Sequence, residues 1–244
     1  MAFKSDFMRV FQTGLEPYGF KKMKGTNCFG KLINNEILLF IVYKKCSSPD
    51  RGKKAFDIIS GVQTIYSYEL SEHQLELSGT SLINYTSKVQ QSNINVNFIY
   101  DQTNQLSVIN QALQQTISEA MPILLKINDL QSSLEFLIKY KLGMLYPVDT
   151  FFRDSVLLIL TNNHDSFEER IRQEEKIALN LYASEQNDEV FKNYMQQITD
   201  IIKNKLVKSR DKVWASQELQ KELQKEINQR IDKNKKILTQ YGML

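Results

Sequence analysis

The chain has 244 residues, of which 42% are hydrophobic and 24% are charged, and its formal net charge is +3. This composition is typical of a globular protein with one large or two smaller domains. The longest apolar run, residues 37–43, is far shorter than the ~20 residues that a membrane helix needs. Lys4, Asp6 and Arg9 stand where a signal peptide would have its apolar region. We therefore expect a cytoplasmic protein without a membrane span, and the presence of only two cysteines agrees with that compartment.

The first segment, residues 3–15, is predicted to be a helix because its apolar residues recur at helical spacing. Residues 27–33 and 36–44 then form a predicted β-hairpin around Asn34-Asn35, since asparagine tolerates the positive φ of a two-residue turn. In that register Cys28 lies opposite Ile41, on the face that packs against the first helix. The same register separates Cys28 from Cys46, so we expect two free thiols.

The next segments complete a predicted sheet. Residues 36–44 are apolar on both faces, which indicates a strand in the middle of the sheet. Residues 54–65 are predicted to be a third strand, and residues 74–85 a further hairpin around Ser78-Gly79. Residues 94–100 alternate between apolar and polar side chains, as a half-buried strand does. The first hundred residues therefore predict one helix followed by four or more mostly antiparallel strands.

After residue 100 the apolar period becomes helical. Leu106, Ile109, Leu113, Ile117 and Ala120 share one helical face, and Pro122 is placed where a new helix can begin. Residues 148–241 contain neither Gly nor Pro, which favours helices over hairpins. We therefore predict an α+β domain over residues 1–145, with an N-terminal helix and a sheet packed with helices, and an all-α extension over residues 146–244. The extension packs on the first part or on a partner.

Several motifs along the first half resemble one family. They are "GFKK" after the first helix, an apolar second hairpin strand, "FDIISG", and a helix that ends at "AMP". Over residues 5–140 the chain is similar to the bacterial domain of unknown function 4304 family. The resemblance implies a fold but no established activity and no transferable catalytic residue. Some members of that family stand where immunity proteins of toxin systems are expected, so the resemblance points to protein binding.

Motifs for chemistry are few. The sequence has no phosphate-binding glycine loop, no Cys-x-x-Cys and no His-Glu-x-x-His. Glu69, His73 and Glu76 would share one face of a helix and are a weak metal motif, without the second copy that a di-iron bundle needs. His164 precedes Asp165, which is better explained as a helix N-cap. We expect no catalytic residue, no cofactor and no metal.

One segment is strongly basic. Residues 21–54 carry nine basic and two acidic side chains, a net charge of +7. The predicted hairpin brings most of the basic ones toward one open end. The candidate contacts are Lys21, Lys22, Lys24, Lys44, Lys45, Arg51, Lys53 and Lys54. They could be a solubilising rim at a sheet edge, a surface for an acidic partner protein, or a phosphate-binding surface for nucleic acid.

Three hypotheses follow. The leading one is a non-catalytic cytoplasmic protein-interaction module, immunity-like in the sense that the family resemblance implies. The second is a nucleic-acid-binding protein that uses the basic hairpin, although lysine dominates over arginine there and arginine is the better bidentate phosphate ligand. The third is an enzyme whose site is assembled from scattered residues. The terminal helix, with Leu219, Leu223, Ile227 and Ile231 at steps of four, is expected to bury its stripe on its own chain rather than on a partner.

Overall fold

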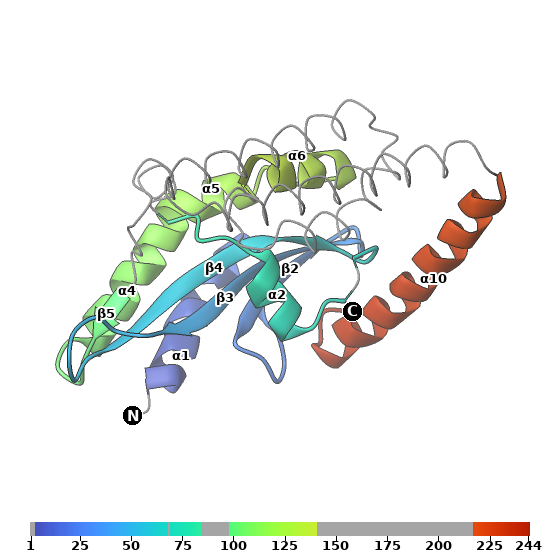
Figure 1. Ribbon diagram of the computed structural model, residues 1–244. Helices are drawn as coiled ribbons and strands as arrows, with labels where there is room; N and C mark the ends of the chain where they lie inside the picture. The colour runs from blue at the N-terminus through green and yellow to red at the C-terminus, as the bar shows by residue number, and fades with distance from the viewer. Residues whose placement is uncertain (1–2, 68, 84–97, 141–216) are drawn as a thin grey trace, which may run out of the picture.

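The structure, a computed structural model, describes residues 3–67, 69–83, 98–140 and 217–244. In chain order its elements are α1 (Phe3–Leu15), η1 (Glu16–Tyr18), β1 (Lys21–Lys22), β2 (Cys28–Ile33), β3 (Ile37–Cys46), β4 (Lys54–Thr64), α2 (Glu72–Ser78), β5 (Phe98–Tyr100), α4 (Gln105–Gln115), η2 (Thr116–Ala120), α5 (Met121–Leu124), α6 (Leu130–Tyr140) and α10 (Gln217–Gln240). Figure 1 shows an antiparallel sheet with helices on both of its sides. The predicted α+β class is confirmed. The predicted domain boundary at residue 145 lies outside the described residues.

The sheet is a simple meander. Its five strands follow the order β1-β2-β3-β4-β5, and every neighbouring pair is antiparallel. β3 lies in the middle, and its residues Ile37–Val42 are all buried, as its apolar sequence on both faces predicts. The predicted third strand is β4. Of the predicted strand at residues 94–100, the structure describes Phe98–Tyr100, which pair with the start of β4.

The hairpin turn is as predicted, but the register is not. Asn34 and Asn35 have φ values of 53° and 58°, and the Glu36 N–H donates to the Ile33 C=O at 3.0 Å. The ladder nevertheless resumes with Ile33 opposite Ile37, so Glu36 is an extra residue, whose C=O instead accepts a hydrogen bond from Ile65. The prediction that Cys28 faces Ile41 is therefore wrong.

This slip of one residue exchanges the faces of β2. Cys28 lies opposite Val42, and Phe29 takes the place opposite Ile41. The first face, against α1, holds Phe29, Leu39 and Ile41, whereas Cys28 and Val42 belong to the core of the second face. Neither cysteine forms a disulfide bond, as the prediction expects.

The first face is covered by α1 and α4. From α1, the side chains of Phe7, Phe11 and Leu15 enter the core, and from α4 those of Ile109 and Leu113. The rings of Phe7 and Phe11 stack with centroids 4.1 Å apart. This face is therefore closed by apolar and aromatic packing from helices that begin shortly before and after the sheet in the sequence.

The predicted helical face after residue 100 is confirmed in most positions. Ile109, Leu113 and Ala120 are buried, but Leu106 is 48% exposed because it lies in the first turn of α4. α4 passes through the π turn η2 into α5, where the Met121 N–H donates to the Thr116 C=O. Pro122 is in the first turn of α5, as predicted.

The second face is covered by α2 and α10. The hairpin predicted around Ser78-Gly79 is wrong, because residues 72–78 form α2 and Leu75 packs into the second core. Glycine at position 79 allows the backbone to lie close against the sheet, because a Cβ at this position would be 2.4 Å from Ile59 Cγ2. The neighbouring Thr80 then bridges to Ser60 of β4 through two backbone hydrogen bonds.

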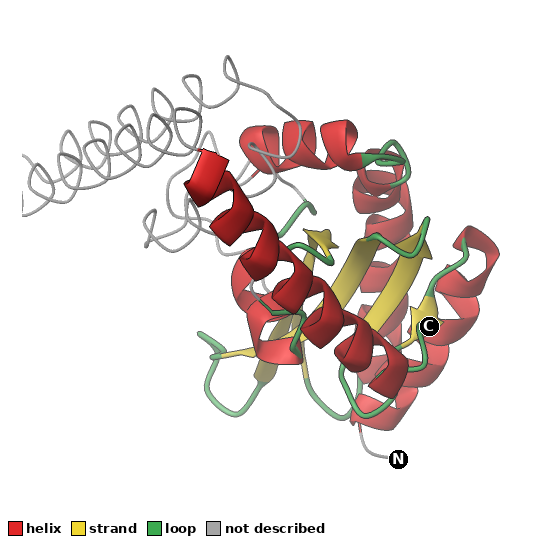
Figure 2. Ribbon diagram, turned by 90° about the vertical axis from the view of Figure 1, so that its right-hand side faces the viewer, coloured by secondary structure: helices red, strands yellow, loops and turns green. Residues whose placement is uncertain are grey.

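α10 runs across the strands on this second face (Figure 2). Its Ile227 and Leu238 are buried, so the terminal helix packs on its own chain, as expected. The side chains of Leu219 and Leu223 lie outside the described residues. The helix ends in a Schellman motif: Gly242 has a φ of 71°, and the Met243 N–H donates to the Leu238 C=O at 2.9 Å.

Asn234 fixes α10 to the loop that follows β4. Its amide group, which is fully buried, donates to the C=O of Ile65 at 2.9 Å and of Ser67 at 2.7 Å, and accepts from the Leu70 N–H at 3.0 Å. The Tyr241 hydroxyl accepts from the Glu72 N–H at 3.2 Å, which ties α10 to α2 as well. None of the helices within the described ranges is long and apolar enough to cross a membrane.

Candidate functional site

The candidate site is a groove between α1 and the edge strand β1. The chain reverses direction after α1 through η1 and Gly19, whose φ of 80° favours glycine and whose N–H donates to the Glu16 C=O at 2.9 Å. This reversal brings β1 back alongside the helix. One flank of α1 therefore faces the edge of the sheet, while its apolar face covers the sheet itself.

The groove has a volume of about 690 Å³ and is open to solvent. Seven of its lining side chains come from α1 and its end, and one comes from β1: they are Lys4, Ser5, Met8, Arg9, Gln12, Thr13, Glu16 and Lys22. Met8 is the buried member, at 6% exposed, and the others are partly or fully in contact with solvent. Three cationic side chains and one carboxylate give the lining a net charge of +2 at neutral pH.

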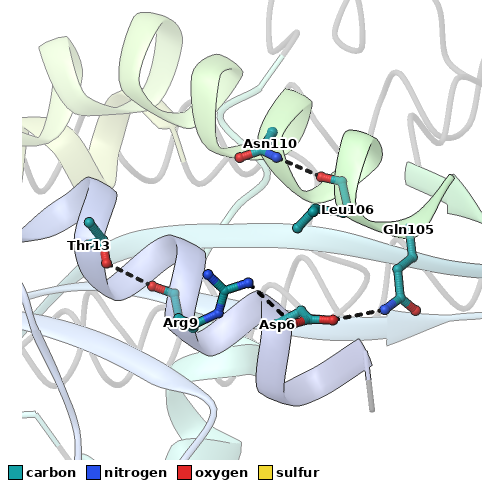
Figure 3. Close-up of polar contacts among 6 residues, drawn as sticks. All are labelled: Asp6, Arg9, Thr13, Gln105, Leu106 and Asn110. Carbon is teal, nitrogen blue, oxygen red and sulfur yellow. Dashed lines mark hydrogen bonds and ion pairs between the residues drawn. The ribbon is translucent and has the colours of Figure 1, made fainter. Parts of the chain in front are cut away.

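Arg9 is held at the rim of the groove by Asp6 (Figure 3). Its Nη2 lies 3.4 Å from Asp6 Oδ1, and 65% of the Arg9 side chain is exposed. The other oxygen of Asp6, Oδ2, accepts a hydrogen bond from Gln105 Nε2 of α4 at 3.0 Å. Asp6 is itself 8% exposed. The carboxylate thus orients Arg9 and offsets part of its charge. Among the described residues, Lys4 and Lys22 are therefore the groove cations that have no carboxylate partner.

Of the eight basic residues predicted as contacts, Lys22 alone lines the groove. Alternation along β1 places Lys21 on the opposite face, the face of its buried neighbour Met23. Lys24 follows, and its backbone N–H donates to the Tyr241 C=O at 3.0 Å. These three lysines are exposed at the β1 edge, two strands away from Lys44.

The other five lie at the far end of β3 and β4. In the ladder Lys44 is opposite Asp57 and Lys45 is opposite Phe56, so these two lysines point to different faces of the sheet. Lys54 is opposite Tyr100. In the connecting loop, Lys53 forms an ion pair with Asp50 at 3.4 Å, and Arg51 is exposed. The pairing register therefore distributes the eight residues over both faces, the edge and the end of the sheet.

Lys4 and Arg9 are functional candidates that the sequence reasoning missed. They precede the basic segment 21–54 and belong to a helix that was identified by its apolar residues alone. The polar flank of that helix, which includes Lys4, Gln12 and Glu16, could have indicated these candidates. The apolar spacing and the charge count over residues 21–54 both leave this flank out. Only the reversal at Gly19 brings this flank next to Lys22.

Cys28 is not in the state that a nucleophile requires. Burial, with a further contribution from the negative charge of Glu72, raises the pKa of its thiol to about 12. The thiol is therefore protonated at neutral pH, whereas reactive cysteines have a lowered pKa. Cys46 is half-buried near the end of β3.

The three residues of the weak metal motif lie in and just before α2. Glu69 accepts a hydrogen bond from Lys233 Nζ at 2.8 Å, which lowers the pKa of its carboxyl group. Burial and the nearby Glu72 raise the pKa of the Glu76 carboxyl. His73 is exposed. Within the described ranges no group of His, Cys, Asp and Glu side chains is placed to hold a metal ion. His164 and Asp165 lie outside those ranges.

No protein-family model, curated protein or solved structure matches this chain. The resemblance to the domain of unknown function 4304 family therefore stays a prediction. The geometry by itself offers a basic, open groove at a sheet edge, which is suited to binding an anionic group from a large partner rather than to enclosing a small molecule.

Proposed function

We propose that this protein is a non-catalytic cytoplasmic interaction module that binds an acidic segment of a partner protein in the groove between α1 and β1. The observation that carries the proposal is the net charge of +2 in the lining of this groove. Opposite charge at such a surface increases the association rate and selects the partner. An immunity-type role, in which binding blocks a toxin, is the form of this proposal that the family resemblance suggests.

A protein partner is favoured over nucleic acid by the composition of the groove. Its lining contains no aromatic side chain on which a base could stack. Its single arginine is already paired with Asp6, so the planar group that best recognises phosphates is engaged. Glu16 would also lie close to any phosphate bound there. An acidic peptide can place its carboxylates next to Lys4 and Lys22 and a neutral residue next to Glu16.

Binding is also favoured over catalysis. The buried cysteine Cys28 has a raised rather than a lowered pKa. The groove contains no histidine or cysteine, and its one carboxylate, Glu16, is exposed. These groups suit charge recognition, since the lining does not pair a nucleophile with a general base.

The test is a titration of the protein into a fluorescein-labelled peptide of six glutamates flanked by glycines, followed by fluorescence anisotropy. We expect binding that weakens as salt is raised from 50 to 500 mM, because the screening length between exposed charges falls from about 14 Å to about 4 Å over that range. The double variant Lys4→Glu, Lys22→Glu should lose the binding. The control variant Lys235→Glu, Lys236→Glu changes the same charge at two exposed positions of α10 and should bind like the wild type.

Two results would contradict the proposal. If the wild-type protein, folded by circular dichroism, does not bind the peptide at 50 mM salt, the groove is not an acidic-peptide site. A labelled 20-nucleotide single strand that binds more tightly than the peptide, and loses its binding in the Lys4, Lys22 variant alone, would assign the groove to nucleic acid instead.

A further inference from the structure

We infer that the acidic segment binds as an extended strand that pairs with β1 and adds a sixth strand to the sheet. This inference rests on the proposed function and specifies the conformation and the charge pattern of the partner. Addition of a strand to an exposed sheet edge is a general mode of peptide recognition, in which backbone hydrogen bonds give affinity and side chains give selectivity.

β1 is an edge strand with unpaired backbone on one side. Among the described residues it pairs with β2 alone. The Met23 N–H donates inward to the Cys28 C=O at 2.9 Å. Residues of an antiparallel strand alternate between facing the neighbouring strand and facing away from it. The N–H and C=O of Lys22 therefore point away from β2, along the open side of the edge, while the Lys22 side chain lines the adjoining groove.

The position of the groove matches that of an added strand. A strand paired with β1 would lie about 4.8 Å beyond it. The groove occupies this side, since it is bounded by Lys22 of β1 and by the α1 flank from Lys4 to Glu16. A helix of 13 residues is about 20 Å long, which equals about six residues of extended chain. A six-residue segment would thus run along the whole flank.

The two successive lysines of β1 point to opposite faces of the sheet edge, which predicts the charge pattern of the partner. Lys22 points to the α1 face, with Lys4 and Arg9, while Lys21 points to the face of α10. An added strand also directs its successive side chains to alternate faces. A partner with acidic residues at consecutive positions would therefore place one carboxylate near Lys22 and the next near Lys21. This pattern differs from that of an amphipathic strand, which is acidic at every second position.

The length of the free edge is limited at both ends. At the near end the Phe20 N–H is bonded to the Leu15 C=O, and at the far end the Lys24 N–H is bonded to the Tyr241 C=O of the α10 terminus. The backbone pairing is thus short and centred on Lys22, and the charges of the groove provide the rest of the contact. The inference accordingly predicts a partner site of about six residues rather than a long shared sheet.

The experiment compares two peptides of equal charge on the unchanged protein. One is the hexaglutamate probe used above, and the other carries N-methyl groups on three consecutive central residues, which remove the backbone N–H groups in either strand register. We expect the methylated peptide to bind about tenfold more weakly or worse. Hydrogen exchange followed by NMR should show the Lys22 amide newly protected by the unmodified peptide. The Lys21 amide, which faces β2, is the matched control and should change little.

The outcomes separate this inference from the proposed function. If both peptides bind equally and the Lys22 amide stays unprotected, while the Lys4, Lys22 double variant still abolishes binding, the groove binds acidic segments but strand addition is wrong. If neither peptide binds, the proposed function is wrong and the inference falls with it. A peptide with glutamate at every second position that binds as tightly as hexaglutamate would contradict the predicted charge pattern.

Discussion

The two faces of the sheet are covered by different means. On the first face α1 and α4 contribute a dense group of apolar side chains, including the stacked rings of Phe7 and Phe11. The second face has a smaller core, covered by α2 and by α10. There the contacts include directional hydrogen bonds from the buried side chain of Asn234 and from Tyr241.

The difference shows two ways of placing a helix. Apolar packing supplies most of the free energy of burial but tolerates small shifts, because it is not directional. An amide that donates twice and accepts once has a single position in which all three bonds form. We therefore interpret Asn234 as the residue that fixes where α10 lies along the sheet, whereas α1 is positioned by the shape of its aromatic core. Three substitutions test this comparison.

The largest effect is expected on the first face. Phe11→Ala removes a ring that is fully buried against Phe7 and should lower the free energy of unfolding by about 3–5 kcal/mol. Urea unfolding followed by circular dichroism measures the change. A loss below about 1 kcal/mol would mean that the aromatic core does not position α1.

Asn234→Ala tests the second face. It leaves the C=O groups of Ile65 and Ser67 and the N–H of Leu70 without their partner, so we expect a loss of about 2–4 kcal/mol. The control is Asn228→Ala on the same helix, where the side chain is exposed, with an expected change below about 0.5 kcal/mol. Hydrogen exchange at Leu70 should accelerate in the first variant only. Equal effects of the two variants would show that apolar contacts alone hold α10.

The smallest expected effect is a gain in stability, and it concerns α2. Burial, together with Glu72, raises the pKa of the Glu76 carboxyl. The stabilising contribution of Glu76 is therefore complete below the ordinary glutamate pKa of about 4.3 and is lost as the pH rises through the raised value. Glu76→Gln should have a higher urea midpoint than the wild type at pH 7.

That advantage should disappear near pH 3.5, where Glu76 is protonated in the wild type as well. The midpoints of both proteins are compared across this range. An advantage that grows toward low pH would mean that the environment of Glu76 favours the charged form, and that α2 is held by a charge interaction like the one between Glu69 and Lys233.

Much of the fold could be predicted because its elements have strong local signals. The helix at residues 3–15 and the buried strand β3 follow from apolar spacing alone. The register of the hairpin could not be predicted, since the extra residue Glu36 is fixed by a hydrogen bond from Ile65 of the following segment. Gly79 was misread as a turn for a similar reason: it is needed for close contact with Ile59, which no local pattern indicates.

The site was less predictable than the fold. The charge count over residues 21–54 identifies Lys22 but cannot tell which lysines share a face, because that depends on the register. Lys4 and Arg9 join Lys22 only through the approach of α1 to β1. The role of Asn234 could not be predicted either, since a buried asparagine within a polar helix has the same sequence context as an exposed one.

The position of α10 in the sequence has a consequence for synthesis in the cell. β4 ends at Thr64, whereas α10 begins at Gln217, about 150 residues later. At a translation rate of about 5–20 residues per second, roughly 8–30 s separate the two segments on the ribosome. During that interval the core of the second face lacks the side chain of Leu238, which α10 contributes to it. The nascent chain therefore presents a transient apolar surface of the kind that chaperones recognise, and the second face closes last.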